Sequence, residues 1–115
     1  MPHDLPLLLD LAQACRDILE FAQEMDYPAF VRDRRTQSAV IHQFLVIGEA
    51  AKQLSDGFKA THPEMPWNDM ARMRDKLIHH YREVKLRVIW DAIQGDIPRL
   101  LASPNPLVPG ADAPR

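Results

Sequence analysis

Four side chains capable of acid–base or phosphate chemistry lie within residues 73–81, which read MRDKLIHHY. They are Arg74, His79, His80 and Tyr81. A guanidinium presents planar N–H donors that match an anionic oxygen pair, and an imidazole exchanges its proton near neutral pH. The segment could therefore hold an anion and move a proton, provided that the fold brings these side chains together.

The apolar residues around the motif are typical of an amphipathic helix. At about 100° per residue, Tyr81 lies only about 20° from Arg74 on the helix surface, whereas His79 lies about 140° from it. Two arrangements could still unite them in one site. Either the helix ends or bends near His79, or a second copy of the chain completes the site across a two-fold axis.

Each of these side chains also has a purely structural explanation. An arginine beside an apolar stripe often lays its methylenes on the core, and a histidine near a helix C-terminus interacts favourably with the helix dipole. A tyrosine at a helix end often buries its ring and leaves its hydroxyl in water. These explanations are favoured for any one residue, but the spacing of all four points to a site.

The composition is that of one ordinary globular domain. The chain has 115 residues, of which 46% are hydrophobic and 26% charged. A net charge of −2 excludes a globally basic nucleic-acid binder but not a local basic patch. The one cysteine, Cys15, excludes an internal disulfide and is predicted to be a buried, inert thiol. No apolar run is long enough for a membrane span and no signal peptide is recognisable, so we expect a cytoplasmic protein.

Hydrophobic residues recur at helical spacing along nearly the whole chain. Four such stripes follow one another, at residues 8–25, 40–58, 67–81 and 84–93. Asp4 is the predicted N-cap of the first helix, and Asp96 could cap a last short turn. Residues 29–39 could form a separate helical turn followed by a break, and the Gly- and Pro-containing residues 55–66 are predicted to be the main loop.

This pattern predicts an all-α fold, an antiparallel up-and-down four-helix bundle that is homodimeric. Gly48 and Ala51 would allow close approach of a neighbouring helix. The helical domain is expected to cover residues 1–102. Residues 103–115 are rich in proline and without periodicity, and they are predicted to be a disordered tail.

The order of the motif, an arginine, four residues, a histidine, one residue and a tyrosine, resembles the signature of the HEPN superfamily. The chain is most similar to the HepT-type branch, the toxin halves of HEPN–MNT toxin–antitoxin pairs. Three segments carry this resemblance: DRRTQSAVIHQFLVIGEAAKQLS at 33–55, PWNDMARMRDKLIHHYREV at 66–84 and IWDAIQGDIPRL at 89–100. The chain departs from that pattern at Asp75, usually Asn, and at Lys85, often acidic. Asp75 could pair with Arg74 or with a neighbouring lysine.

The resemblance implies a metal-independent endoribonuclease toxin that needs no cofactor. Arg74 would stabilise charge on the phosphate, and His79 would relay a proton between the ribose 2′-hydroxyl and the leaving oxygen, giving a 2′,3′-cyclic phosphate and a 5′-hydroxyl. Tyr81 would support catalysis or receive AMP from a partner MNT-type nucleotidyltransferase, the antitoxin. An anion added at Tyr81 would silence the site.

Glu49 is the predicted supporting residue. It lies in IGEA beside residues that face the core, where a carboxylate is costly unless it is paired. We therefore expect Arg74, or a residue close to it, to donate a hydrogen bond to Glu49. The alternative is a solvated carboxylate at the edge of the stripe.

A local basic surface accompanies the motif, because residues 72–87 hold six basic side chains and two acidic ones. Such a patch suits RNA phosphates and would equally suit an acidic partner protein, although a solvated helix face is the commoner explanation of any one charge run. The RNA-binding candidates are Arg72, Lys76, His80, Arg82 and Lys85.

No metal site is predicted, since no pair among His42, His62, His79 and His80 has i, i+4 spacing. The rival functional hypothesis is a non-catalytic helical module that docks a nucleotidyltransferase. It requires only an exposed Tyr81, whereas a ribonuclease requires Arg74 and His79 at a common cleft.

Overall fold

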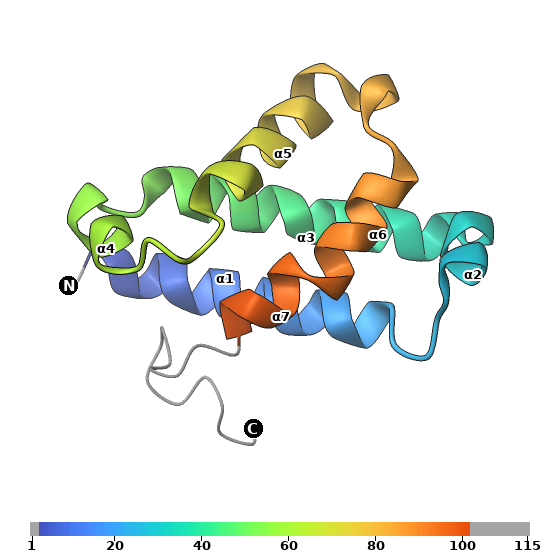
Figure 1. Cartoon of the computed structure of the whole chain (residues 1–115), viewed down its shortest axis with the longest axis horizontal. Coiled ribbons are helices and arrows are strands. Elements are labelled where there is room, and N and C mark those ends of the chain that lie inside the picture. Colours follow the sequence, from blue (N-terminus) through green and yellow to red (C-terminus); the bar gives the residue numbers. More distant parts are fainter. Residues whose placement is uncertain (1–2, 102–115) are drawn as a thin grey trace.

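Two long antiparallel helices form the base of the fold (Figure 1). They are α1 (Asp4–Phe21) and α3 (Arg34–Gln53) in a computed structural model that describes residues 3–101. Helix α5 (Trp67–His79) packs obliquely on α3, and α6 (Leu86–Gln94) continues into α7 (Asp96–Leu101), which packs on α1 (Figure 1). All regular structure within residues 3–101 is helical, so the predicted all-α class is confirmed.

Apolar side chains of α1, α3, α5, α6 and α7, together with Phe30 of α2 (Tyr27–Arg32), form one continuous core. The most completely buried members are Leu11, Cys15, Ile18, Phe30, Val40, Phe44, Ile47, Met70, Ile89, Ile93 and Ile97. Burial raises the pKa of the Cys15 thiol to about 12, so it remains protonated at neutral pH. The prediction of a buried, inert cysteine is confirmed.

The connection between the two long helices contains the separate turn that the sequence suggested. Helix α2 (Tyr27–Arg32) begins after Asp26, whose carboxylate accepts a hydrogen bond from the Ala29 N–H at 2.9 Å. The Asp33 carboxylate accepts from the Thr36 N–H at 2.9 Å and so caps the start of α3. Because Asp33 has non-helical backbone angles, α2 and α3 do not merge.

The predicted capping role of Asp4 is wrong. The N-cap of α1 is His3, without a side-chain cap, and Asp4 is the first residue within the helix. Its buried carboxylate instead accepts hydrogen bonds from the Ser55 N–H at 2.9 Å and from the Ser55 hydroxyl at 2.7 Å. Asp4 thereby ties the start of α1 to the segment that follows α3.

The predicted loop at residues 55–66 contains a short helix, α4 (Asp56–Thr61). Its N-cap is Ser55, whose hydroxyl accepts a hydrogen bond from the Phe58 N–H at 3.2 Å. Within residues 3–101, none of the helices combines the length and apolarity that crossing a membrane would require. The predicted tail, residues 103–115, lies outside the described residues.

Candidate active site

Arg74 on α5 is held against α3 by an ion pair with Glu49. Its Nη2 lies 2.8 Å from the Glu49 Oε2, and only 23% of the Arg74 side chain is exposed. The partner that the sequence expected for Glu49 is therefore Arg74 itself. This bond fixes the guanidinium in position and reduces the desolvation cost of its charge.

The absence of a side chain at Gly48 allows this close approach of α5. A Cβ built at Gly48 would overlap the Arg74 Cβ and would lie 2.8 Å from the Met70 carbonyl oxygen. The first neighbour is the root of a side chain and the second is backbone, so neither can move away without shifting α5. Gly48 thus positions Arg74 by bringing the two helices together.

A second carboxylate, Asp75, also contacts Arg74. The Asp75 Oδ1 lies 3.0 Å from the Arg74 Nη1 and 3.0 Å from the Lys52 Nζ. Hydrogen bonds from Lys52 and then from Arg74 hold the pKa of Asp75 below its usual value. The sequence left open whether Asp75 pairs with Arg74 or with a lysine, and in the structure it pairs with both.

The polar contacts around Arg74 and Glu49 extend one helical turn along α3. The Gln53 amide donates a hydrogen bond to the Glu49 Oε1 at 2.6 Å, while the Glu49 Oε2 faces Arg74. Lys52 and Gln53 were not among the candidate residues. Their positions three and four residues after Glu49 could have indicated them, because side chains at this spacing share a helix face.

Helix α5 ends at His79, as in the first of the two arrangements that the sequence left open. His80 has φ −138° and ψ 46°, and the chain then enters the 3₁₀ helix η1 (Tyr81–Glu83). His79, His80 and Tyr81 are all exposed, Tyr81 at 59%. Within residues 3–101, no hydrogen bond or ion pair joins His79 or Tyr81 to Arg74. The helix end exposes these side chains without closing the motif within one copy.

A depression of about 480 Å³ adjoins the Arg74–Glu49 pair. Its apolar lining comes from three helices and consists of Leu7, Leu45, Val46, Ala50 and Ile78. Ile78 is 46% exposed, although it lies between the two ends of the motif. Arg74 therefore borders an apolar surface of α1, α3 and α5.

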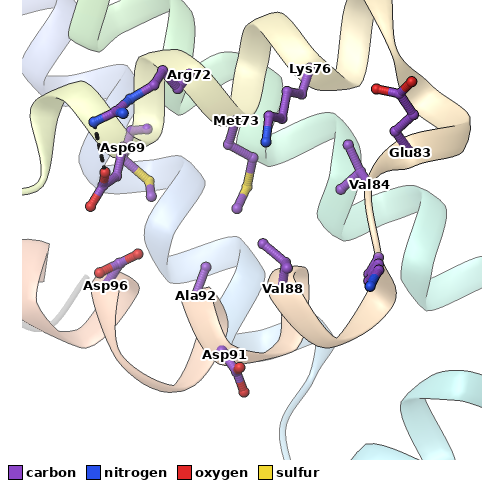
Figure 2. A pocket seen from close by; sticks show the side chains of 12 residues that line it. Asp69, Arg72, Met73, Lys76, Glu83, Val84, Val88, Asp91, Ala92 and Asp96 are labelled. Carbon is purple, nitrogen blue, oxygen red and sulfur yellow. Dashed lines mark hydrogen bonds and ion pairs between the residues drawn. The ribbon is translucent and has the colours of Figure 1, made fainter.

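A larger cleft, of about 750 Å³, lies between α5 and α6. Figure 2 shows Met73 and Lys76 of α5 pointing into the space that Val88 and Ala92 face from the opposite side. Among the RNA-binding candidates, Arg72, Lys76 and Lys85 line this cleft. His80 and Arg82 are exposed but are not part of its lining, and the His80 Nδ1 lies 3.8 Å from the Glu83 Oε2.

No three His, Cys, Asp or Glu side chains in the described part of the chain are grouped so that they could hold a metal ion. The groups capable of chemistry here are a fixed guanidinium on α5, exposed imidazoles at its C-terminal end and basic side chains along the neighbouring cleft. Such groups can bind a phosphodiester and exchange protons with it.

The helical bundle, together with the Arg-x₄-His-x-Tyr motif at the end of α5, defines a HEPN-type protein. The chain belongs to the ribonuclease HepT-like family, whose sequence model matches residues 11–107.

Curated relatives agree with this assignment. A protein of Thermococcus cleftensis named "Probable ribonuclease HepT" is 50% identical over 93 residues, which cover 81% of this chain and 84% of the relative. A protein of Methanocaldococcus jannaschii that is provisionally named as an RNase is 43% identical over 91 residues, covering 79% and 75% of the two chains. One of Caldanaerobacter subterraneus, named likewise, is 38% identical over 95 residues, covering 83% and 85%. No solved structure matches the chain.

Proposed function

We propose that this protein is the metal-independent endoribonuclease toxin of a HEPN–MNT toxin–antitoxin pair. The observation that carries the proposal is the Arg74–Glu49 ion pair, which fixes a guanidinium on the helix that ends at His79. Membership of the ribonuclease HepT-like family supports the same reading. No cofactor enters the proposed reaction.

The proposed reaction is an internal transfer at phosphorus. His79 removes the proton of a ribose 2′-hydroxyl, and the resulting oxygen attacks the adjacent phosphorus atom. The bond from phosphorus to the 5′-oxygen breaks, and that oxygen receives a proton from an imidazolium. The products are a 2′,3′-cyclic phosphate and a 5′-hydroxyl. Arg74 stabilises the charge that builds on the non-bridging oxygens.

We further propose that the site is completed in a homodimer. Arg74 and His79 are separated by about 140° around α5, so they do not face one phosphate easily within a single copy. An isologous pair would place Arg74 of one copy near His79 of the other. The apolar depression beside Arg74, with the exposed Ile78, supplies the kind of surface that such an interface would bury.

The proposed control is adenylylation of Tyr81 by an MNT-type nucleotidyltransferase. The phenol oxygen attacks the α-phosphorus of ATP, pyrophosphate leaves, and the phenol proton passes to solvent. Tyr81 is exposed and lies outside α5, so a partner enzyme can reach it. The added phosphodiester is an anion tethered close to the basic residues, and it competes there with RNA.

The second candidate function is the non-catalytic docking module. It is favoured by one observation: the Arg74 guanidinium already forms ion pairs with Glu49 and Asp75, whereas the Tyr81 side chain is exposed at the surface. In that case the motif would serve only as an acceptor for the partner.

RNA cleavage by purified, unmodified protein separates the two functions. The wild-type chain should cut cellular RNA in the presence of excess EDTA and leave cyclic-phosphate ends. His79→Ala and Arg74→Ala should each abolish cleavage while retaining the wild-type circular dichroism spectrum. If the unmodified wild-type protein leaves RNA intact but still accepts AMP at Tyr81, the docking function replaces the catalytic one.

A further inference from the structure

One end of the cleft between α5 and α6 holds Asp96, at the start of α7, and Asp69, near the start of α5, which pairs with Arg72 at 3.3 Å. Lys76, Lys85 and Glu83 line the other end. Figure 2 shows the Asp96 carboxylate facing the gap, whereas the Asp91 carboxylate points away from it. The two ends of the cleft therefore carry different sets of charged groups.

The middle of the cleft is apolar. Its lining there consists of Met70, Met73, Val84, Val88 and Ala92. A volume of about 750 Å³ is within the range of clefts that hold small ligands, roughly 300–1,000 Å³. Methionine and valine side chains pack well against a flat aromatic ring, and a thioether contributes a further favourable contact with such a ring.

The charged groups at the two ends are incompletely compensated. Within residues 3–101, no ion pair involves Lys76 or Lys85, so both ammonium groups can bind an anion. The nearest cation to Asp96 is Arg99 at 3.8 Å, and only 27% of the Asp96 side chain is exposed. Burial, and then the neighbouring Asp69, raise the pKa of Asp96. An ionised Asp96 would gain from additional N–H donors.

We propose that this cleft is a nucleobase subsite that selects guanine in single-stranded RNA, with the phosphate at Lys76 and Lys85 and the base edge at Asp96. The proposal rests on the ribonuclease function proposed above and adds its sequence preference. Guanine donates two parallel N–H groups, N1–H and N2–H, which match the two oxygens of one carboxylate. Uracil offers one N–H between two carbonyl oxygens, and these oxygens would be repelled by the Asp96 carboxylate.

Helix geometry connects this subsite with the proposed catalytic histidine. His79 follows Lys76 by three residues, which places it about 4.5 Å farther along the axis and about 60° around it. Side chains at this spacing are neighbours on the helix surface. A nucleotide whose phosphate is bound at Lys76 would therefore present its phosphodiester beside His79. Asp96 would act as a specificity-determining residue, not as a catalytic one.

The test measures RNA binding by the full chain carrying His79→Ala, so that cleavage does not interfere. The probes are fluorescein-labelled RNA octamers of uridine, either unmodified or with a single guanosine, adenosine or cytidine. The guanosine octamer should bind roughly tenfold more tightly than the all-uridine octamer. Adding Asp96→Asn should remove this preference, because it weakens binding of the guanosine octamer and relieves the repulsion of uracil in the all-uridine octamer. Asp91→Asn is the matched control and should retain the preference, because Asp91 lines the cleft but its carboxylate points away from the gap and pairs with Arg87.

The lysines are tested by the salt dependence of the same binding. Changing Lys76 and Lys85 to glutamine should weaken all four octamers by the same factor. It should also reduce the slope of log affinity against log salt by about 0.7 per lysine. In the His79→Ala protein, 5′-GMP should displace the labelled octamer at a lower concentration than 5′-UMP, a measurement that requires no further variant to fold.

Each outcome has a distinct meaning. A guanine preference that survives Asp96→Asn, or equal displacement by the two nucleotides, overturns the subsite even if the wild-type protein cleaves RNA. If the guanine preference depends on Asp96 but the unmodified wild-type protein cleaves no RNA, the subsite is supported and the ribonuclease function is overturned. If the lysine variants lose a nucleotidyltransferase partner but bind RNA normally, the cleft is a protein-docking groove and the proposal fails.

Discussion

Gly48 on α3 faces Arg74 on α5 at a distance that leaves no room for a side chain. A Cβ at Gly48 would collide with the Cβ of Arg74 and crowd the Met70 carbonyl oxygen. The residue proposed to bind phosphate is therefore placed by the packing of two helix backbones. A change at Gly48 should affect stability and function together.

Gly48→Ala should lower the free energy of unfolding by about 1–3 kcal/mol, the usual cost of overpacking, and should reduce RNA cleavage by displacing Arg74. Gly57→Ala is the matched control, because a Cβ there would meet nothing within 4 Å. It should stabilise α4 by about 0.4–1 kcal/mol and leave activity unchanged. Urea denaturation and a cleavage assay measure both effects. Equal stability of the two variants would contradict the packing argument.

Asp75→Asn should lower the KM for RNA by roughly twofold to fivefold, since an ion pair at the surface contributes up to about 1 kcal/mol. The substitution removes a carboxylate that competes with the substrate phosphate for Arg74 and also neutralises a pairing with Lys52. Asp91→Asn also removes one half of an exposed ion pair, with Arg87, but should not alter KM. Steady-state kinetics at low salt gives the comparison, and an unchanged or higher KM for Asp75→Asn would refute the competition.

Asp4 should make the free energy of unfolding depend on pH in the acidic range. Hydrogen bonds from the Ser55 N–H and hydroxyl hold the pKa of Asp4 below its usual value. Because the folded pKa is lower than the unfolded one, the contribution of Asp4 is fully present above pH of about 4 and is lost as the pH falls through the folded pKa. Asp4→Asn should thus be destabilising near pH 7, with a smaller difference from wild type near pH 3.

Denaturation of the wild type and Asp4→Asn at several pH values tests this sign. Asp10→Asn, on an exposed position of α1, is the control and should differ little from wild type at any pH. An Asp4→Asn deficit that stays constant or grows toward low pH would show that the carboxylate charge is not what Ser55 stabilises.

Ile78→Asp should shift the proposed dimer toward monomer in analytical ultracentrifugation at micromolar concentration. The side chain is 46% exposed beside the apolar depression at Arg74, so a charge there would have to be buried in the interface. Val31→Asp, at a 42% exposed position on α2, is the control and should leave the dimer intact. A strictly monomeric wild-type protein would remove the dimer from the proposed mechanism.

Tyr81 should gain one AMP when the chain is incubated with its partner nucleotidyltransferase, ATP and Mg²⁺, and RNA cleavage should fall in parallel. The prediction follows from the exposure of Tyr81 and from its place next to the basic residues of the motif. Tyr81→Phe should show no mass gain by intact-mass spectrometry. The other tyrosine, Tyr27, is half-buried with Arg87 over its ring at 4.6 Å, and it should remain unmodified. A modification mapped to Tyr27 would rule out this control mechanism.

The sequence by itself determined the features that depend on neighbours along one helix. The recurrence of apolar residues predicted the helical class and many of the core positions, including the buried Cys15, although Ile78 and Val88 of the same stripes are exposed. The spacing of Arg74, His79 and Tyr81 indicated that the motif is spread around a helix, and the short run around Asp33 suggested the break before α3. These are contacts within one or two turns, and their geometry follows directly from 3.6 residues per turn.

The tertiary structure alone decided which distant residues meet. Asp4 looked like a local cap but binds Ser55, 51 residues away, because the ends of α1 and α3 lie side by side. Lys52 reaches Asp75 only because Gly48 lets α5 approach α3. Asp69 and Asp96 belong to different helices and share a cleft only when α6 folds back beside α5. Such pairings depend on how helices cross and pack, which local spacing does not specify.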